Sequence, residues 1–203
     1  MKTIVILSGG VDSTVILWRC LASGDDIKAI SFDYGQRHRK ELIAARTIAE
    51  LAGVEHKVVR LNQWGDLMRH VLLTPVPHGH HEDEVQKTTV VPNRNMVFIS
   101  IAASWAMAEG YDRVAIGAHA GDHHIYHDCR EEFFAPLSLA LAACDERKID
   151  IWRPYVRSPK SEVIADGRHL GAPLELTWTC YEGREVPCGK CGACVEREEA
   201  ECQ

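Results

Sequence analysis

One hexapeptide near the N-terminus, Ser-Gly-Gly-Val-Asp-Ser at residues 8–13, constrains the fold of this chain more than any other feature. It follows an apolar run at residues 3–7 and precedes residues 13–18, whose apolar side chains fit one face of a helix. A strand, a two-glycine turn and a helix start form an anion cradle, because the free N–H groups of the first helical turn point at the bound group. The glycines leave room for a phosphate. The stretch therefore predicts a phosphate-binding turn.

The polar side chains of the hexapeptide narrow this prediction. Ser8 and Ser13 add hydroxyl donors, and Asp12 can cap the helix or hold a magnesium ion. An ordinary connection with a capping residue would explain a lone Gly-Gly pair, but the whole hexapeptide resembles the PP-loop of the N-type ATP pyrophosphatases. Those enzymes release pyrophosphate from ATP and leave an adenylated intermediate. The Lys of the Gly-x-x-x-x-Gly-Lys-Ser/Thr loop is missing, so the loop is unlike that of kinases and GTPases.

The first half of the chain alternates strand and helix patterns. We expect strands at residues 2–7, 27–32 and 56–61, and helices at 12–23 and 39–52. This rhythm predicts βαβ units, hence an α/β fold with a parallel sheet and helices on both faces. Right-handed crossovers place the loops after the strands on one edge, where ligands bind in such sheets. Residues 33–38 should therefore face the same crevice as the hexapeptide.

The second half continues the pattern after a less regular stretch. Residues 62–92 predict a short helix at 62–73 and then a long loop. The His- and acid-rich run at 78–84 has the side chains to bind a metal, but a solvated loop is the favoured interpretation. Helices are expected at 96–109 and 131–144, and strands at 113–116 and 149–152. Ser158 and Pro159 predict a further helix start, with Ser158 as the cap and Pro159 in the first helical position.

Four cysteines near the C-terminus, Cys180, Cys188, Cys191 and Cys194, form the second strong motif. The last three are spaced by two residues each, with a glycine in each gap, so that the four thiolates can close on one tetrahedral Zn²⁺. A four-cysteine iron–sulfur cluster uses similar spacings, but the usual bacterial run has a different last gap and a following Pro. We favour zinc over iron–sulfur and disulfides. Four protein ligands leave no open position, so the metal is expected to be structural.

The composition is that of a soluble globular protein, with 46% hydrophobic and 26% charged residues and no apolar run of membrane-spanning length. The net charge of -6 argues against non-specific nucleic-acid binding. The N-terminal apolar stretch is cut short at Ser8 and is too short for a signal peptide. We therefore expect a cytoplasmic protein without direct nucleic-acid contacts, in which the eight cysteines serve metal binding or chemistry before disulfides.

Five motifs in one order carry a family resemblance. They are residues 8–13, Phe-Asp-Tyr-Gly-Gln-Arg-His at 32–38, Val-Pro-Asn-Arg-Asn at 91–95, Tyr-His-Asp-Cys-Arg at 126–130, and Thr-Trp-Thr-Cys-Tyr at 177–181 leading into Cys-Gly-Lys-Cys at 188–191. Over nearly the whole chain they resemble the QueC family of 7-cyano-7-deazaguanine (preQ0) synthases. The resemblance implies a C–N bond-forming ligase that uses ATP to convert 7-carboxy-7-deazaguanine and ammonia into the nitrile preQ0. That product serves queuosine, archaeosine or DNA-modification pathways.

The resemblance also implies an architecture and partners. The fold would be a three-layer α/β/α sandwich of the adenine-nucleotide α-hydrolase type at residues 1–175, with a zinc-binding subdomain at 176–203 packed on it. The protein would be a homodimer with one structural Zn²⁺ per chain. No stretch fits a glutaminase domain, so the ammonia would be free or delivered by a separate protein.

The resemblance and the chemistry of an acyl adenylate together imply roles for individual residues. ATP would be held by the PP-loop and by the loop after the second strand, with Mg²⁺ shared between ATP and Asp12. The nucleotide set is Leu7, Ser8, Gly9, Gly10, Val11, Asp12, Ser13, Gln36 and Arg37. Arg94 would pair with the substrate carboxylate or a phosphate, Tyr126 would stack on the deazapurine, Asp128 would accept from its guanine-like edge, and Arg130 would add a cation. The catalytic set is Asp12, Ser13, Arg94, Asp128 and Lys160, with Lys160 reaching a phosphate.

This chain departs from the family pattern at two positions. His127 stands where the family usually has Pro, and Asn93 stands where many relatives have Gly. A proline fixes its own backbone and restrains the residue before it, so its loss should loosen the loop that presents Asp128. An alternative therefore stays open, in which the enzyme stops at the 7-amido product or activates another carboxylate.

Two further interpretations compete with this one. A PP-loop tRNA thiolase would need a sulfur-carrying cysteine, for which Cys129 is the candidate, and a means to hold tRNA, against which the acidic charge argues. A non-catalytic zinc-binding module would explain the cysteines but not the intact PP-loop.

Overall fold

The computed structural model describes residues 1–37, 39–80 and 84–202 of the 203-residue chain. Its centre is a sheet of five strands in the order β3-β2-β1-β4-β5, in which every neighbouring pair is parallel. The strands are β1 (Lys2–Ile6), β2 (Asp26–Asp33), β3 (Glu55–Arg60), β4 (Arg113–Ala115) and β5 (Asp150–Trp152). The prediction of an α/β fold with a parallel sheet is confirmed.

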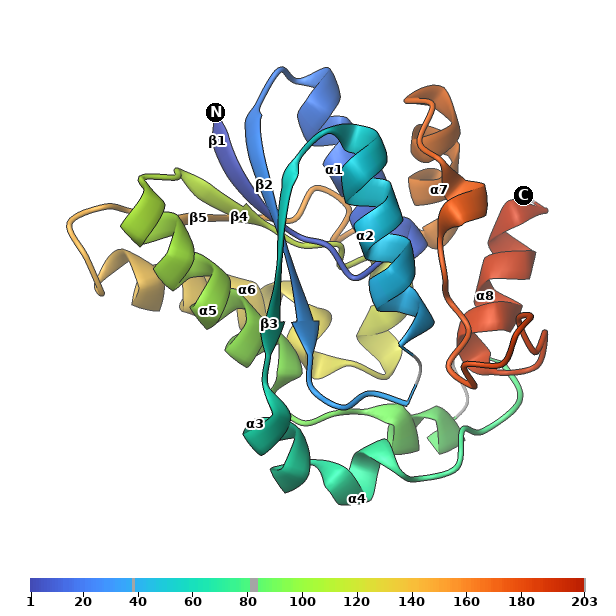
Figure 1. Cartoon of the computed structure of the whole chain (residues 1–203). Coiled ribbons are helices and arrows are strands. Elements are labelled where there is room, and N and C mark those ends of the chain that lie inside the picture. The colour runs from blue at the N-terminus through green and yellow to red at the C-terminus, as the bar shows by residue number, and fades with distance from the viewer. Residues whose placement is uncertain (38, 81–83, 203) are drawn as a thin grey trace.

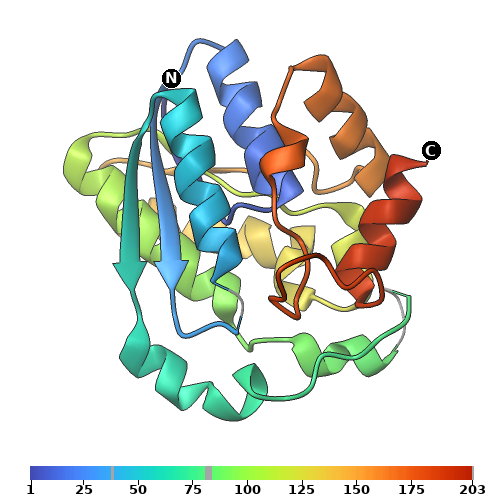
Figure 2. The same cartoon turned by 45° about the vertical axis from the view of Figure 1, so that its right-hand side comes forward.

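Helices cover both faces of this sheet (Figures 1 and 2). Successive residues of β1 point to opposite faces, as the period of two in a strand requires, and each set enters its own buried core. Ile4 and Ile6 pack against α5 (Arg94–Glu109) and α6 (Glu131–Ala142). Val5 packs against α1 (Val11–Ala22), α2 (Lys40–Ala52) and α7 (Lys160–His169). The sheet is buried on both sides, as expected for parallel strands, and the three layers are those expected.

Short elements close the edge of the sheet to which the strands point. The segment after β3 forms α3 (Asn62–Leu67), α4 (Arg69–Leu72) and the 3₁₀ helix η1 (Glu84–Thr89), which lie at the bottom of Figure 1. The single helix expected at 62–73 is broken at Met68, whose φ and ψ of -92° and 5° lie outside the helical range. Three residues of the run at 78–84, at positions 81–83, lie outside the described residues.

The remaining elements were harder to predict. The 3₁₀ helices η2 (Ala120–His124), η3 (His127–Cys129) and η4 (Leu174–Leu176) are each five residues or shorter. The last helix, α8 (Gly192–Glu201), was not predicted and packs beside α7. The predicted cap at Ser158 is wrong by one residue, because Pro159 is extended (φ -68°, ψ 161°) and itself occupies the cap position before Lys160. Among the described residues, no helix combines the length and the apolar character needed to cross a bilayer.

Candidate active site

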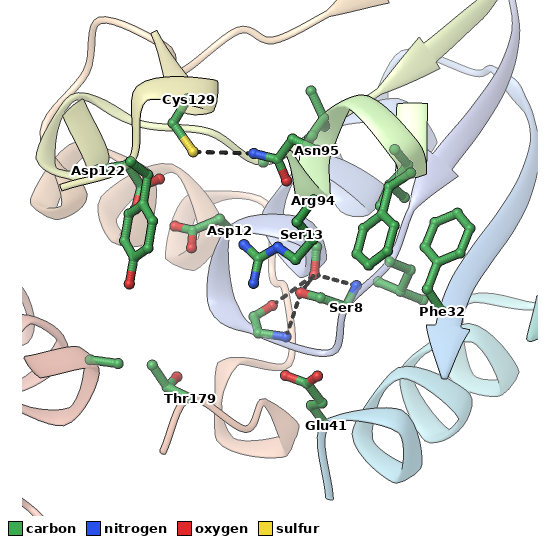
Figure 3. Close-up of a pocket in the computed structure, with 18 of the residues that line it drawn as sticks. Ser8, Asp12, Ser13, Phe32, Glu41, Arg94, Asn95, Asp122, Cys129 and Thr179 are labelled. Carbon is green, nitrogen blue, oxygen red and sulfur yellow. Dashed lines mark hydrogen bonds between the residues drawn. The ribbon is translucent and has the colours of Figure 1, made fainter. Parts of the chain in front are cut away.

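A cavity opens at the edge of the sheet where the strands end. Its lining comes from the PP-loop, the end of β2, the first turns of α2, α5 and α7, the segment after β4, and the C-terminal tail (Figure 3). Loops after parallel strands meet here, as the βαβ pattern predicted. The cavity is therefore the candidate active site.

The PP-loop has a tight conformation that depends on one glycine. Gly9 has φ of +90°, and a Cβ at this position would lie 2.1 Å from the carbonyl oxygen of Glu41. A side chain therefore does not fit, and the loop lies directly against the first turn of α2. Gly9 and Val11 face away from the cavity, whereas the other predicted members of the loop line it: Leu7, Ser8, Gly10, Asp12 and Ser13.

The hydroxyl groups of the PP-loop bond within the loop (Figure 3). The Oγ atoms of Ser8 and Ser13 lie 3.1 Å apart, and the Gly10 N–H donates to Ser8 Oγ over 3.3 Å. Ser13 Oγ donates to the Gly10 carbonyl over 3.1 Å. Two hydroxyls and the start of α1 thus converge on one point, which is the geometry of a phosphate cradle.

An ion pair lies beside the cradle. Lys160 Nζ is 2.7 and 2.6 Å from the two carboxylate oxygens of Asp12, and 3.4 Å from Nε2 of the buried His119. Burial alone would raise the pKa of Asp12, but Lys160 and His119 hold it below its ordinary value. Burial alone would lower the pKa of Lys160, but Asp12 and Glu196 hold it above its ordinary value. Both members of the pair are therefore charged at neutral pH.

The N-terminus of α5 supplies a cation from the opposite side. Asn93, at the cap position, has a left-handed backbone (φ 60°), which an asparagine adopts more readily than most residues. Arg94 follows it, and its guanidinium points into the cavity (Figure 3). Burial works against its charge, but Tyr34 and Asp128 hold its pKa above the ordinary value. Among the described residues, no carboxylate oxygen lies within 4.0 Å of its nitrogens.

Two of the predicted substrate residues lie outside this cavity. Asp128 and Arg130 line a shallower hollow on the far side of the start of α5. The Asp128 carboxylate accepts from the Asn95 backbone N–H over 3.0 Å, so it caps α5. Arg130 donates through Nε to the His123 carbonyl over 2.7 Å and contacts the exposed His127. The structure thus separates this pair from Arg94 and Tyr126, which do line the cavity.

The two predicted nucleotide residues after β2 also lie elsewhere. Gln36 is buried and bonds to the backbone of Phe32 and Tyr34 at 3.0 and 2.9 Å, so it fixes the turn after the strand. Arg37 donates to the carbonyls of Leu72 and Thr74. Both line a second hollow next to the active-site cavity.

Several residues that line the cavity were not among the predicted ones. Glu41 and Asp122 carry no motif that marks them in the sequence, because their position depends on the fold. The tail supplies Trp178, Tyr181 and Glu196, of which the first two stand in a family motif without a role.

Cys129 lines the cavity as a thiol. Its Sγ accepts from Asn95 Nδ2 over 3.3 Å, and burial together with Asp122 and Asp128 raises its pKa well above the ordinary value. Since only a thiolate is an effective sulfur nucleophile, this site does not favour the thiolase interpretation.

The four tail cysteines form a compact cluster. One sulfur from each of Cys180, Cys188, Cys191 and Cys194 lies within 4.8 Å of the others, close to the about 3.8 Å expected between thiolates around tetrahedral zinc. The backbone N–H groups of Lys190 and Cys191 donate to Cys188 Sγ over 3.4 and 3.3 Å. Burial opposes the thiolate, but these donors bring the pKa of Cys188 down to about 7. The four sulfurs, together with the backbone N–H groups that support Cys188, fit a structural zinc site.

The cluster is tied to the active site. The backbone N–H of Trp178 donates to the carbonyl of Gly9 in the PP-loop over 2.9 Å. Tyr181, next to the first ligand, places its hydroxyl 3.3 Å from that of Tyr126 across the cavity wall. The tail therefore forms one wall of the cavity rather than a separate appendage.

Solved structures of two enzymes share this fold. The chain is similar to the U34-tRNA thiolase NcsA from Methanococcus maripaludis, with a TM-score of 0.56 and 21% identity over 98% of this chain and 64% of that one. It is also similar to the NMN synthetase from Francisella tularensis, with a TM-score of 0.54 and 18% identity over 92% of this chain and 69% of that one. At these identities the likeness concerns the fold alone.

Sequence comparison identifies the family. A 7-cyano-7-deazaguanine synthase from Psychromonas ingrahamii is 44% identical over 98% of this chain and 92% of its own length. One from Methanoregula boonei is 44% identical over 98% of this chain and 94% of its own length. The sequence profile of the queuosine biosynthesis protein QueC matches residues 2–202. With the PP-loop cavity and the four-cysteine cluster in place, the chain thus belongs to the QueC family.

Proposed function

We propose that this protein is an ATP-dependent ligase that converts 7-carboxy-7-deazaguanine and ammonia into 7-cyano-7-deazaguanine. The observation that carries the proposal is the placement of Arg94 in the phosphate-binding cavity, charged and without a carboxylate partner within 4.0 Å among the described residues. A buried cation of this kind calls for an anion. A substrate carboxylate held at Arg94 lies beside the cradle where the α-phosphate of ATP must react.

The first half of the reaction makes the carboxylate reactive. The PP-loop N–H groups and the hydroxyls of Ser8 and Ser13 hold the phosphates, and Lys160 lies within the same cavity to stabilise the charge of the departing pyrophosphate. Attack of the carboxylate on ATP gives an acyl adenylate and pyrophosphate. Ammonia then displaces AMP and gives the amide. No protein nucleophile is required, so the protein acts by positioning and by electrostatics.

The second half removes the amide oxygen. A second activation by ATP converts that oxygen into a leaving group, and its departure with the loss of a proton leaves the nitrile. Arg94 again faces the reacting group. Mg²⁺ held by ATP and the charged Asp12 would neutralise phosphate charge in both activations.

The cofactors and partners follow from this chemistry. We propose one structural Zn²⁺ on the four cysteines, a division between residues 1–175 and 176–203, a homodimer, and a cytoplasmic location without direct nucleic-acid contacts. Ammonia is supplied free or by a separate protein.

The test is product analysis by mass spectrometry. The zinc-loaded protein is incubated with ATP, Mg²⁺, ammonium and 7-carboxy-7-deazaguanine. Nitrile together with AMP is the expected result. The amide as the only product would favour the alternative in which the enzyme stops after one activation. ATP binding without conversion of this acid would refute the proposal, and other carboxylic acids would then be tested as substrates.

A further inference from the structure

The active-site cavity continues into a second hollow. Five residues line both spaces and mark the waist between them: Tyr34, Glu41, Arg94, Tyr126 and Tyr181. The PP-loop lies on the cavity side of this waist, and η1 and α4 close the far side of the hollow. Two connected spaces with the cation Arg94 between them suit a reaction that joins two molecules.

The walls of the second hollow suit a flat ring. Tyr34 is fixed by Phe98, with ring centroids 5.4 Å apart, and by Trp64 at 5.6 Å. On the opposite wall the Tyr126 hydroxyl lies 2.9 Å from Thr89 Oγ1 and 3.3 Å from the Tyr181 hydroxyl. Aromatic walls with polar groups at their rims are typical of sites for planar heterocycles.

Of the residues that the structure describes, Glu41 is the one carboxylate that lines the second hollow. It lies in the first turn of α2, and its carboxylate points into the cavity (Figure 3). Gln36 Nε2 donates to its Oε1 over 3.2 Å, and Gly9 packs against its backbone. These contacts fix the position of a negative charge at the waist.

We propose that the second hollow holds the heterocycle of the acid substrate and that Glu41 is its specificity residue. This assignment rests on the proposed function. The ring N–H and the exocyclic amine of the 7-deazaguanine form a paired donor edge, which one carboxylate accepts with two hydrogen bonds. Arg94, at the same waist, pairs with the carboxylate of the substrate. The waist thus offers a cation for the acid of the ligand and an anion for its donor edge.

The test compares Glu41→Gln with the wild-type protein by isothermal titration calorimetry. The ligands are 7-carboxy-7-deazaguanine, its analogue without the exocyclic amine, and ATP. Because hydrogen bonds to charged groups are the strong ones, we expect the substitution to weaken binding of the acid on the order of 10- to 100-fold. ATP affinity should stay within about twofold. The analogue should bind the wild type more weakly than the acid does, and the variant should no longer distinguish the two ligands.

The control is Glu50→Gln, an exposed position on the same helix. It should leave all three affinities unchanged. Glu41→Gln keeps an oxygen that accepts from Gln36, so α2 should remain folded. The melting temperature of the variant checks this. A loss of ATP affinity alone would assign Glu41 to the nucleotide and overturn the proposal. Unchanged affinity for the acid would overturn it as well. Failure of the wild type itself to bind the acid would instead refute the proposed function.

Discussion

Lys160 Nζ lies 2.7 and 2.6 Å from the two carboxylate oxygens of Asp12, although 148 positions separate the residues in the chain. The contact joins the start of α1 to the start of α7, so the phosphate cradle and its cation are placed by one interaction. Asp12 holds Lys160 charged and in the cavity, and Lys160 keeps the Asp12 carboxylate charged despite its burial. Each residue therefore depends on the other to stay charged.

Replacement of Lys160 by Met should abolish most of the activity. The variant removes a charge aimed at the phosphates, and loss of one such group costs on the order of 100-fold or more in turnover. The measurement is the rate of AMP release with the acid and ammonium present. Lys148→Met, at an exposed lysine before β5, is the matched control and should retain the wild-type rate. Retention of more than about one third of the rate by Lys160→Met would remove Lys160 from the catalytic set.

The PP-loop should reject a side chain at Gly9. Gly9→Ala combines a positive φ with a Cβ placed 2.1 Å from the Glu41 carbonyl, so the loop and α2 must separate. We expect at least tenfold weaker ATP binding and a lower melting temperature. Gly24→Ala is the control, because Gly24 has φ of +68° with no atom within 4 Å of the added Cβ. That variant should cost only about 1 kcal/mol of unfolding free energy, with normal ATP affinity. Equal effects in the two variants would contradict the close approach.

Zinc removal should open the active site. Trp178 and Tyr181 line the cavity and flank Cys180, so release of the cluster removes one wall. We expect Cys191→Ser to lose zinc, to bind ATP more weakly and to be cleaved by protease first within residues 176–203, while residues 1–175 persist. Cys202→Ser, at an exposed cysteine outside the cluster, should keep its zinc and resist cleavage. Zinc-free protein with unaltered ATP affinity would mean that the tail wall does not depend on the metal.

The sequence predicted most of the fold and only part of the site. Strands and long helices were predictable because their apolar periods are local, and the PP-loop and the cysteines were predictable because their residues are neighbours in sequence. Asp128 was expected in the pocket because of its chemistry, but the structure uses its carboxylate to cap α5. Glu41 was missed because only the packing of α2 brings it to the cavity. Such placements depend on tertiary contacts that no local pattern encodes.

The departure from the family at His127 should have little effect on catalysis. The ring is exposed, contacts Arg130 and lines the hollow outside the active-site cavity. Tyr126 before it has φ and ψ of -106° and 102°, which a following proline permits, and His127 is the first residue of η3, where proline is well tolerated. We expect His127→Pro to keep turnover within about twofold and to raise the unfolding free energy by about 0.5 kcal/mol. The variant His127→Ala removes the imidazole ring without adding a proline, so it separates the loss of the ring from the backbone restriction that proline brings. A change from amide to nitrile in His127→Pro would instead show that this loop controls the second activation.

A buried ion pair far from the active site should govern stability in acid. The Asp25 carboxylate, whose side chain is 3% exposed, accepts from Thr3 and from Arg113 over 2.6 Å each. Burial alone would raise its pKa, but the hydrogen bonds from Thr3, the N-terminal ammonium and Arg113 hold it below 3.8. Its contribution to stability is therefore present above the unfolded-state value of 3.8 and is lost as the pH falls through the lower folded-state pKa. Asp25→Asn should lower the unfolding free energy at pH 7 by about 3 kcal/mol, because it leaves Arg113 buried without its partner.

The measurement is a series of urea titrations from pH 7 to pH 3. The gap in unfolding free energy between wild type and Asp25→Asn should narrow only at the acid end. The control Asp66→Asn, at an exposed position on α3, should follow the wild type throughout. A gap that stays constant down to pH 3 would mean that the Asp25 carboxylate takes up its proton at the same pH in the folded and the unfolded state, which would contradict its lowered folded-state pKa.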